Sequence, residues 1–401
     1  MKKNFSVFFI FVAFILSCSV LFSYTILNKA FAEEIKATEK VTSGLNVASK
    51  SAILVDADSG TVLYSQNENA TYPIASMCKI MTLLLIFESI DNGEISLDDK
   101  IIVSENASGM GGSQIFLEAN AEYPVSDLVK GITVASANDA CVAMSEKLCG
   151  NEELFVEKMN EKAKTLGMDN TVFTNCTGLP KAGQHSSAKD VAKMFSELIR
   201  HKDYFTFSGV WMDEINHPKG RITQISNTNK LIRFYNGCDC GKTGYTSEAG
   251  HCLCASAIRD GLRLISVVIS APDSKTRFKE VSSMFNYGFA NYECKTIVNA
   301  ETPLDFTVEI KGGKKATVSL IGERSVKVLS KKNEKRAFEF DFVPNYCIKA
   351  PVMINDNLGT LNIYENGVKI DSISVLASEN IDAKSYLDIL NDVTAKWSVV
   401  S

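Results

Sequence analysis

The spacing of apolar residues divides the first part of the chain into predicted strands and helices. Two short apolar runs flank an Asp-Ser-Gly turn within residues 51–63 and predict a β-hairpin. Helices are predicted over 80–90, 125–149, 152–166, 188–201 and 277–290, and strands over 242–245, 252–257 and 262–270. Strands at both ends with helices between them indicate an α/β domain, whose sheet is completed by its N-terminal and C-terminal parts.

After about residue 293 the pattern changes to short alternating strands. Phe306, Val308 and Ile310 alternate with polar residues before a Gly-Gly pair. A second pair of strands flanks Asn366-Gly367, which is a strong two-residue turn signal. These segments predict a small all-β domain over 294–378 that serves as a spacer or docking module.

The last segment, 379–401, is predicted to be an amphipathic helix. Its apolar residues recur at helical spacing on one stripe: Tyr386, Ile389, Leu390, Val393 and Trp397. Two interpretations stay open, a helix that lies in a membrane interface and a helix that packs on its own domain. Acidic and basic residues share the polar face, so attraction to an anionic surface would be weak.

The N-terminus has the pattern of an export signal. Lys2 and Lys3 precede an apolar run over 5–27, which is followed by Ala30-Phe31-Ala32. This order predicts a signal peptide over 1–32, cleaved after Ala32. The run is also long enough to span a bilayer, so an uncleaved membrane helix is the alternative. In both cases the domain over 33–293 and all that follows are expected to work outside the cytoplasm, in the cell wall or at the outer face of the cytoplasmic membrane.

Composition narrows the class of partner. A length of 401 residues with 45% hydrophobic residues allows two domains with their own cores. The net charge of −5 and the lack of a basic patch argue against a nucleic-acid partner.

The chain contains eleven cysteines, four of which form an ordered group. Cys238 and Cys240 precede Cys252 and Cys254, and an antiparallel hairpin centred near Thr246 would place 238 opposite 254 and 240 opposite 252. Cross-strand disulfides, free thiols and a zinc site are three open interpretations. Four further cysteines lie in apolar surroundings and are expected to be core residues: Cys78, Cys141, Cys149 and Cys176.

Three short motifs carry the candidate chemistry. They are Ser76-Met-Cys-Lys79, Ser136-Ala-Asn138 and Lys242-Thr243-Gly244, which read S-x-x-K, S-x-N and K-T-G. Second copies of the first two patterns occur at 186–189 and 65–67, whereas K-T-G occurs once. The functional interpretation therefore rests on order, spacing and local context.

The residue types of the motifs suit acyl transfer. Serine needs an adjacent base, and Lys79 lies one helical turn from Ser76, where burial or a second cation such as Lys242 would lower its pKa. Pro73 places Ser76 in the first turn of its helix, where a free backbone N–H can face an oxyanion. The second oxyanion donor would be the N–H of Tyr245.

The other motif residues fit the substrate. Ser136 can relay a proton to a leaving amine, Asn138 can hold an amide, and Lys242 with Thr243 suits a terminal carboxylate. Each motif also has a structural interpretation when taken alone: an exposed helix start, a pair of helix caps and a solvated strand end.

The blocks around the motifs resemble the exported serine D-alanyl-D-alanine carboxypeptidases, the low-molecular-mass penicillin-binding proteins. The likeness covers roughly residues 51–292. It includes, in family order, the segments 75–82, 110–117, 134–140, 166–180, 227–231 and 242–246.

The resemblance implies an α/β (α+β) domain of the β-lactamase/transpeptidase type, with a mainly antiparallel five-stranded sheet flanked by helices, followed by a small C-terminal all-β domain and often an amphipathic anchor. It implies that Ser76 attacks the D-Ala-D-Ala bond of peptidoglycan stem pentapeptides with Lys79 as base, and that Ser136 assists proton transfer. Lys242 and Thr243 would hold the carboxylate, and water would release the acyl-enzyme. No metal or other cofactor is implied, and β-lactams would acylate the same serine.

One departure from the family pattern and three competing interpretations remain. Proteins of the family usually have Asp-Gly and an apolar residue before K-T-G, whereas this chain has Asp239-Cys240-Gly241. Cys240 lies two residues before Lys242 and so on the same strand face, and its redox state is hypothesised to affect the site. A β-lactamase would need a glutamate that activates water, and no glutamate lies in a matching motif. A non-catalytic wall-binding protein would be expected to have a broken motif, and none is broken. Four histidines and no G-x-S-x-G disfavour a Ser-His-Asp hydrolase.

Overall fold

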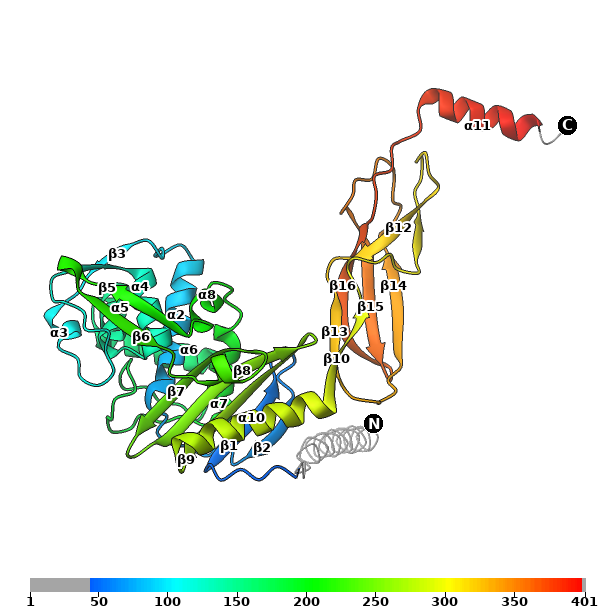
Figure 1. Ribbon diagram of the computed structural model, residues 1–401. Coiled ribbons are helices and arrows are strands. Elements are labelled where there is room, and N and C mark those ends of the chain that lie inside the picture. The colour runs from blue at the N-terminus through cyan, green and yellow to red at the C-terminus, as the bar shows by residue number, and fades with distance from the viewer. Residues whose placement is uncertain (1–43, 399–401) are drawn as a thin grey trace, which may run out of the picture. The chain divides into compact units, whose positions relative to one another are not determined.

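The computed structural model of the chain describes residues 44–398, so the predicted signal peptide lies outside the described residues. Its larger part is built on a five-stranded antiparallel sheet in the order β2-β1-β9-β8-β7 (Figure 1). These strands are Ser51–Asp56 (β1), Val62–Gln66 (β2), Cys238–Thr246 (β7), Gly250–Arg259 (β8) and Leu262–Ala271 (β9). The predicted N-terminal hairpin is confirmed, and it completes the sheet by pairing with β9.

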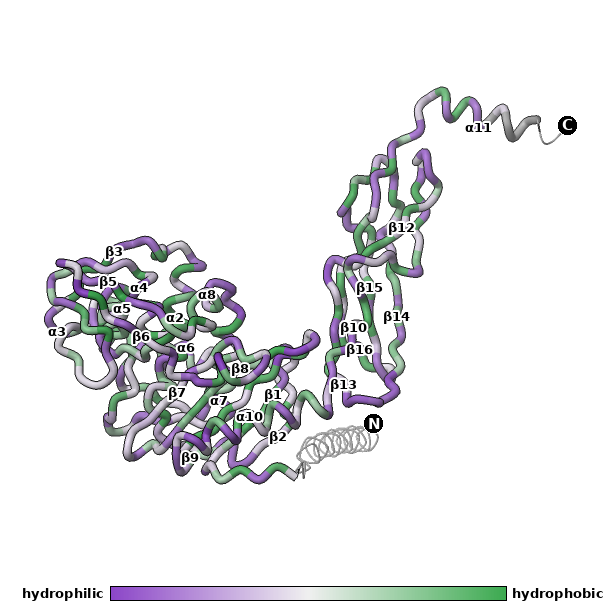
Figure 2. The backbone as a smooth tube through the Cα atoms, in the orientation of Figure 1, coloured by the Kyte–Doolittle hydropathy of each residue, from purple (hydrophilic) through white to green (hydrophobic). Residues whose placement is uncertain are grey.

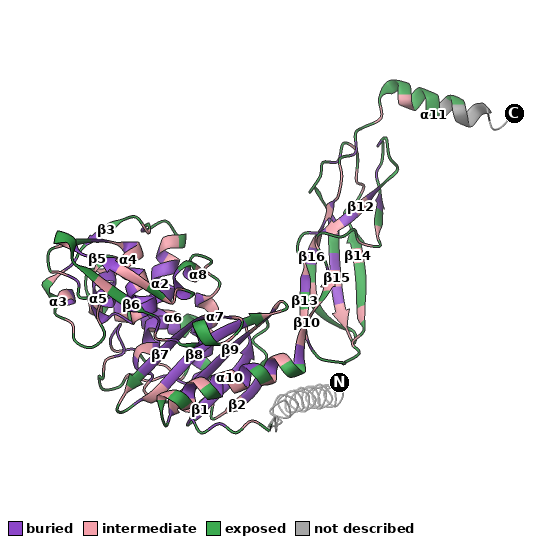
Figure 3. Ribbon diagram, in the orientation of Figure 1, coloured by how far each residue is buried: buried purple, intermediate pink, exposed green. Residues whose placement is uncertain are grey.

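Helices cover both faces of this sheet. Helix α10 (Ser274–Asn291) packs on β8 and β9, where its Gly288 leaves room for Leu54 and Leu264. The alternate residues Ile53 and Ile265 face a larger helical core. That core contains α2 (Lys79–Asp91), α5 (Asn138–Cys149), α6 (Glu152–Thr165) and α7 (Ala188–Leu198). Strand β1 is buried along its whole length because both faces are covered (Figure 3).

The predicted helix over 125–149 is interrupted in the structure. Helix α4 (Val125–Lys130) continues into a π-helical turn, η2 (Gly131–Ala135), and α5 begins only at Asn138. Ser136 between them has φ +62°, a left-handed conformation that ends the helix. The interruption places a Ser-x-Asn turn at the start of α5, and apolar periodicity does not indicate such an interruption.

The start of α2 also differs from the prediction. A 3₁₀ turn, η1 (Ala75–Cys78), precedes the α-helix, so Ser76 lies in this turn. Smaller elements complete this part of the chain, and the sequence pattern does not predict them. They are β3 (Lys100–Ile102), β4 (Glu122–Pro124), β5 (Met212–Asn216), β6 (Ile222–Ser226), α3 (Glu105–Ser108), α8 (Tyr204–Ser208), α9 (Leu231–Phe234) and η3 (Pro218–Gly220).

The register of the β7–β8 hairpin contradicts the predicted cysteine pairing. Thr246 pairs with Gly250, so the hairpin is centred near residue 248 and Cys254 lies opposite Lys242, not opposite Cys238. The shift arises in the turn, where Ala249 donates its N–H to the Thr246 hydroxyl and Gly250 adopts φ +65°. All ten cysteines of the described residues are free thiols, and the described chain has no group of three or more potential metal ligands.

The C-terminal part is an all-β unit followed by one helix. Strands β10 (Tyr292–Val298) and β13 (Val326–Lys331) form a pair, and a five-stranded sheet has the order β11-β12-β16-β15-β14. Its strands are Thr307–Glu309 (β11), Thr317–Gly322 (β12), Phe338–Pro344 (β14), Asn357–Glu365 (β15) and Val368–Ala377 (β16). Both predicted hairpins are confirmed, and Asn366 and Gly367 have the positive φ of a type I′ turn. Hydrophobic residues recur along these strands (Figure 2) and form a core of their own.

Helix α11 (Tyr386–Ser398) confirms the predicted C-terminal helix. Tyr386 is 79% exposed and Ile389 is 51% exposed, so this stripe is not buried against the β-strands in the part of the helix whose side chains are described. No helix within residues 44–398 is long and apolar enough to cross a membrane.

Candidate functional site

The 3₁₀ turn that carries Ser76 is enclosed by two glycines. A Cβ atom added to Gly178 would lie 2.0 Å from the Ala75 carbonyl oxygen, and one added to Gly244 would lie 2.6 Å from the Ile74 carbonyl oxygen. Both distances are far below van der Waals contact, so only glycine lets the 178 loop and strand β7 approach this closely. The nucleophile turn is therefore fixed between a loop and a strand that lie far away in sequence.

Lys79 lies directly behind Ser76. Its Nζ is 3.1 Å from Ser76 Oγ and 2.7 Å from Asn138 Oδ1, and it also donates to the Thr177 carbonyl. The side chain is fully buried, and burial lowers the pKa of Lys79 against the opposing effect of the neighbouring Cys141 thiol. Both the contact and the lowered pKa suit a base that accepts the Ser76 hydroxyl proton.

A second lysine and serine pair completes the centre. Lys242 Nζ lies 2.7 Å from Ser136 Oγ and 3.2 Å from the Thr243 carbonyl, and both side chains are buried. Burial, and then the charge of Lys79, hold the pKa of Lys242 well below its usual value. The left-handed turn at Ser136 is what brings its hydroxyl to Lys242, so the strained residue lies at the point where a proton would pass.

Asn138 is engaged at both ends of its amide. Its Oδ1 accepts from Lys79, and its Nδ2 donates to the Gly111 carbonyl over 2.6 Å. Gly112 leaves room for this amide, since a Cβ there would lie 2.7 Å from Nδ2. In this structure Asn138 therefore holds the Lys79 side chain and the 111–113 loop in place.

The remaining predicted residues lie on strand β7. Thr243 is buried, whereas the Tyr245 side chain is 60% exposed and stacks on the His251 ring at 4.4 Å between centroids. Strand β7 is an edge strand of its sheet, so its outer backbone groups have no strand partner among the described residues. Side-chain contacts join five of the seven predicted residues, Ser76 with Lys79 and Asn138 and Ser136 with Lys242, whereas Thr243 and Tyr245 follow Lys242 on the same strand.

Arg277 is a site residue that the sequence analysis misses. It reaches from α10 under the sheet, and its guanidinium donates to the carbonyl oxygens of Gly244 (3.0 Å) and Cys252 (3.2 Å). Its Nε is buried without a hydrogen-bond partner in the described part of the chain. The only signal in the sequence is a charged residue within an otherwise amphipathic helix, which is too common to single it out.

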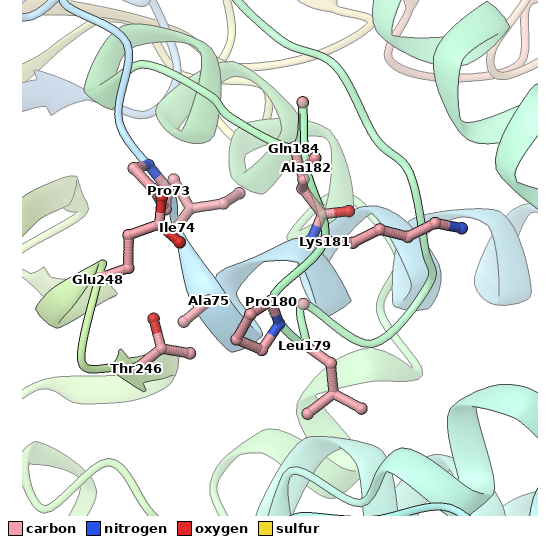
Figure 4. Close-up of a pocket in the computed structure, with 12 residues that line it drawn as sticks. Pro73, Ile74, Ala75, Leu179, Pro180, Lys181, Ala182, Gln184, Thr246 and Glu248 are labelled. Atoms are coloured by element: carbon pink, nitrogen blue, oxygen red, sulfur yellow. The ribbon is translucent and has the colours of Figure 1, made fainter.

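A cavity of about 410 Å³ opens beside the nucleophile turn (Figure 4). It is lined by residues 73–75, by the loop 178–184, and by Thr246 and Glu248 beyond the end of the K-T-G segment. The motif residues that hold charge, Lys79 and Lys242, are not part of its lining.

Family profiles and curated relatives match most of the chain. The profile of the D-alanyl-D-alanine carboxypeptidase family matches residues 36–273, and the profile of the penicillin-binding protein 5 C-terminal domain matches 292–383. The chain is 40% identical to D-alanyl-D-alanine carboxypeptidase DacF of Bacillus subtilis (strain 168) over 360 residues, 90% of this chain and 92% of the relative. It is 30% identical to D-alanyl-D-alanine carboxypeptidase DacC of Escherichia coli (strain K12) over 373 residues, 89% and 90% of the two chains.

Solved structures extend the likeness to the fold. The peptidoglycan synthesis regulatory factor PBP3 of Streptococcus pneumoniae aligns with a TM-score of 0.71 at 25% identity, covering 84% of this chain and all of the other. D-alanyl-D-alanine carboxypeptidase DacD of Francisella tularensis aligns with a TM-score of 0.64 at 27% identity, covering 85% and 95%. The predicted fold class, with its five-stranded sheet and C-terminal all-β domain, is confirmed.

Proposed function

The chain belongs to the D-alanyl-D-alanine carboxypeptidase family, and from this premise we propose that Ser76 is the nucleophile of its active site and Lys79 the base. The protein is a serine-type D-Ala-D-Ala carboxypeptidase of the low-molecular-mass penicillin-binding type. The observation that carries the assignment of roles is the 3.1 Å contact between Ser76 Oγ and the buried Lys79 Nζ.

Acylation begins when Ser76 Oγ gives its proton to neutral Lys79 and attacks the carbonyl carbon of the penultimate D-alanine. The oxyanion of the tetrahedral intermediate is held by the backbone N–H groups of Ser76 and Tyr245. A Cβ atom added to Gly244 would lie 3.2 Å from Ser76 N, so the lack of a side chain at Gly244 lets this strand approach the nucleophile turn. A preorganised pair of donors of this kind stabilises charge that exists only in the transition state.

Collapse of the intermediate breaks the C–N bond and releases the terminal D-alanine. The proton that Lys79 took from Ser76 is relayed through the Ser136 hydroxyl to the leaving amine, so Lys79 becomes neutral again and Ser136 keeps its hydroxyl; the contact of Ser136 with Lys242 supplies the polar environment for this transfer. Water then attacks the acyl-enzyme ester, the Ser76 hydroxyl is restored, and a shortened stem peptide leaves. A β-lactam enters the same cycle at Ser76 and is expected to remain as an ester.

The terminal carboxylate of the substrate is proposed to bind Lys242 and Thr243. Arg277 supports this end of the site from below, since it holds the carbonyl of Gly244 in the same strand. The substrate carboxylate would also favour the protonated form of Lys242. Burial lowers the pKa of this lysine, and contact with an anion raises it again.

The substrate of this family is part of peptidoglycan, which lies outside the cytoplasm. We further propose that residues 1–32 direct export, that 33–293 and 294–378 are the catalytic and spacer domains, and that the helix in 379–401 contacts the membrane. The exposed Tyr386 and Ile389 on α11 support the last proposal.

The test uses the chain without residues 1–32 and diacetyl-Lys-D-Ala-D-Ala. Wild-type protein should release D-alanine, and the Ser76→Ala variant should release none while keeping its thermal unfolding transition. If the wild-type protein releases no D-alanine, the proposed roles are wrong.

A further inference from the structure

The cavity beside the nucleophile turn has a charge that the reaction itself does not use. Glu248 is exposed in its lining and makes no hydrogen bond or ion pair with any described residue. The other charged side chain of the lining, Lys181, donates to the Thr174 carbonyl over 2.9 Å, and Figure 4 shows it extending away from Glu248. The cavity therefore offers one carboxylate that has no partner among the described residues, and the exposed ring of Pro180 is part of its apolar lining.

A peptide that lies along strand β7 would bring one of its residues to the level of this carboxylate. The outer edge of β7 has no strand partner among the described residues, so an extended peptide can lie along it. With its carboxylate at Lys242 and Thr243 and its reactive carbonyl at Ser76, the peptide runs antiparallel to β7 toward Thr246. A strand advances about 3.3 Å per residue, so the residue that precedes D-Ala-D-Ala reaches the level of Thr246 and the cavity.

We propose that Glu248 binds the side-chain ammonium of a diamino acid that precedes D-Ala-D-Ala in the substrate, with the aliphatic part of that side chain against the exposed ring of Pro180. The proposal rests on the proposed function, because the direction of the peptide is set by the carboxylate at Lys242. It makes Glu248 a specificity-determining residue at the end of the site opposite the carboxylate. The substrate is then held by one ion pair on each side of the bond that is cleaved.

The test compares two peptides that differ only in this charge. They are Nα-acetyl-Lys-D-Ala-D-Ala, which has a free ε-ammonium, and its Nα,Nε-diacetyl form, which has none. Wild-type protein should favour the free amine by about two- to fivefold in kcat/KM, the range of one exposed ion pair. Added salt should reduce the preference, because screening weakens exposed pairs.

Two substitutions at one position make the test decisive. Glu248→Gln should give equal kcat/KM values for the two peptides, and Glu248→Lys should favour the diacetyl peptide. The control Glu153→Gln removes an exposed carboxylate of α6 outside the cavity and should keep the wild-type preference. Stoichiometric acylation of Ser76 by a penicillin shows that the active site of each variant is folded.

The outcomes separate the two levels of the argument. Equal rates for both peptides in the wild-type protein, or a preference that survives in Glu248→Gln, would overturn the role of Glu248 alone. Release of D-alanine from neither peptide would overturn the proposed function instead.

Discussion

Lys79 is buried, yet it faces the hydroxyl that it is proposed to deprotonate, and this combination predicts a pH dependence of the reaction. Burial lowers the pKa of Lys79, so the neutral base becomes available at lower pH than for a lysine in water. We expect kcat/KM for D-alanine release to rise with pH until Lys79 is deprotonated. Lys79→Ala should lose about 10²- to 10⁴-fold in rate and lose this rise as well.

The measurement is the pH profile of D-alanine release by the two proteins at constant ionic strength. A Lys79→Ala profile that keeps the wild-type rise would place the titrating base elsewhere. Lys242 would be the next candidate, since its pKa is also held low.

The sequence was sufficient to predict the residues that belong to motifs and insufficient for those that support them. Ser76 and Lys79 are one helical turn apart, so their contact follows from local geometry. The contact between Lys242 and Ser136 joins residues 106 positions apart, and the sequence analysis does not predict it. Arg277 acts through carbonyl groups of another element, and such a contact leaves no pattern in the sequence.

The loop 178–184 is positioned by one glycine, which gives a matched pair of substitutions. Gly178 and Gly183 both have positive φ, +81° and +88°, so alanine is strained at either position. Only at Gly178 would the Cβ atom lie 2.0 Å from Ala75 O, whereas at Gly183 its nearest neighbour is Thr174 Cγ2 at 3.8 Å. Gly178→Ala should therefore lower both stability and acylation of Ser76, and Gly183→Ala should cost only about 1 kcal/mol of stability.

Thermal unfolding and the acylation rate with a chromogenic cephalosporin distinguish these effects. If both variants acylate at the wild-type rate, the close approach of the loop does not position the nucleophile turn.

The β5–β6 hairpin contains a buried histidine that makes the fold sensitive to acid. His217 lies 2.8 Å from the Tyr123 hydroxyl of β4 and 2.8 Å from Thr223 Oγ1. Burial, and then the nearby Arg221, lower the pKa of His217. The unfolded chain therefore binds a proton at higher pH than the folded chain, and stability falls as the pH drops through about 6.5 toward the lowered value.

His217→Gln should flatten this part of the dependence of the free energy of unfolding on pH. Urea unfolding between about pH 5 and 8 measures it. An unchanged slope in the variant would show that the acid sensitivity arises at other groups.

Alternation along β7 and β8 correctly placed the cysteines in strands but not opposite one another. Period-two alternation tells which residues share a face, whereas the register depends on the turn, and the turn at Thr246–Gly250 shifts it. The cysteines of the described chain are free thiols, and seven of them are buried: Cys78, Cys141, Cys176, Cys238, Cys240, Cys252 and Cys254.

Thiol titration of the chain without residues 1–32 tests this arrangement. Only the half-buried Cys149, Cys294 and Cys347 should react before unfolding, and the seven buried thiols should react after it. Burial raises the pKa of the Cys240 thiol well above its usual value, so it should be inert and reductant should not change activity. A reductant-dependent rate that disappears in Cys240→Ala would instead support redox control of the site.

All the site residues named above precede the C-terminal β-strands and helix α11. Every residue of the site described above lies between Pro73 and Arg277, and none comes from the β-strands after Tyr292 or from α11. A soluble peptide should therefore be cleaved equally well with or without the C-terminal helix, whereas attachment to a surface should depend on it.

Helix α11 is expected to bind membranes through apolar contact more than through charge. Its exposed apolar residues include Tyr386, Leu387 and Ile389, while Lys384 is paired with Asp392. Because charge contributes little, binding to phospholipid vesicles should change little with salt. A chain ending at Ser385 should lose sedimentation with vesicles and keep its rate on diacetyl-Lys-D-Ala-D-Ala. Ile389→Asp should weaken sedimentation with vesicles strongly. Asn391→Asp adds the same charge on the polar face and should weaken sedimentation only slightly. Equal sedimentation of the full and shortened chains would rule out α11 as the membrane contact.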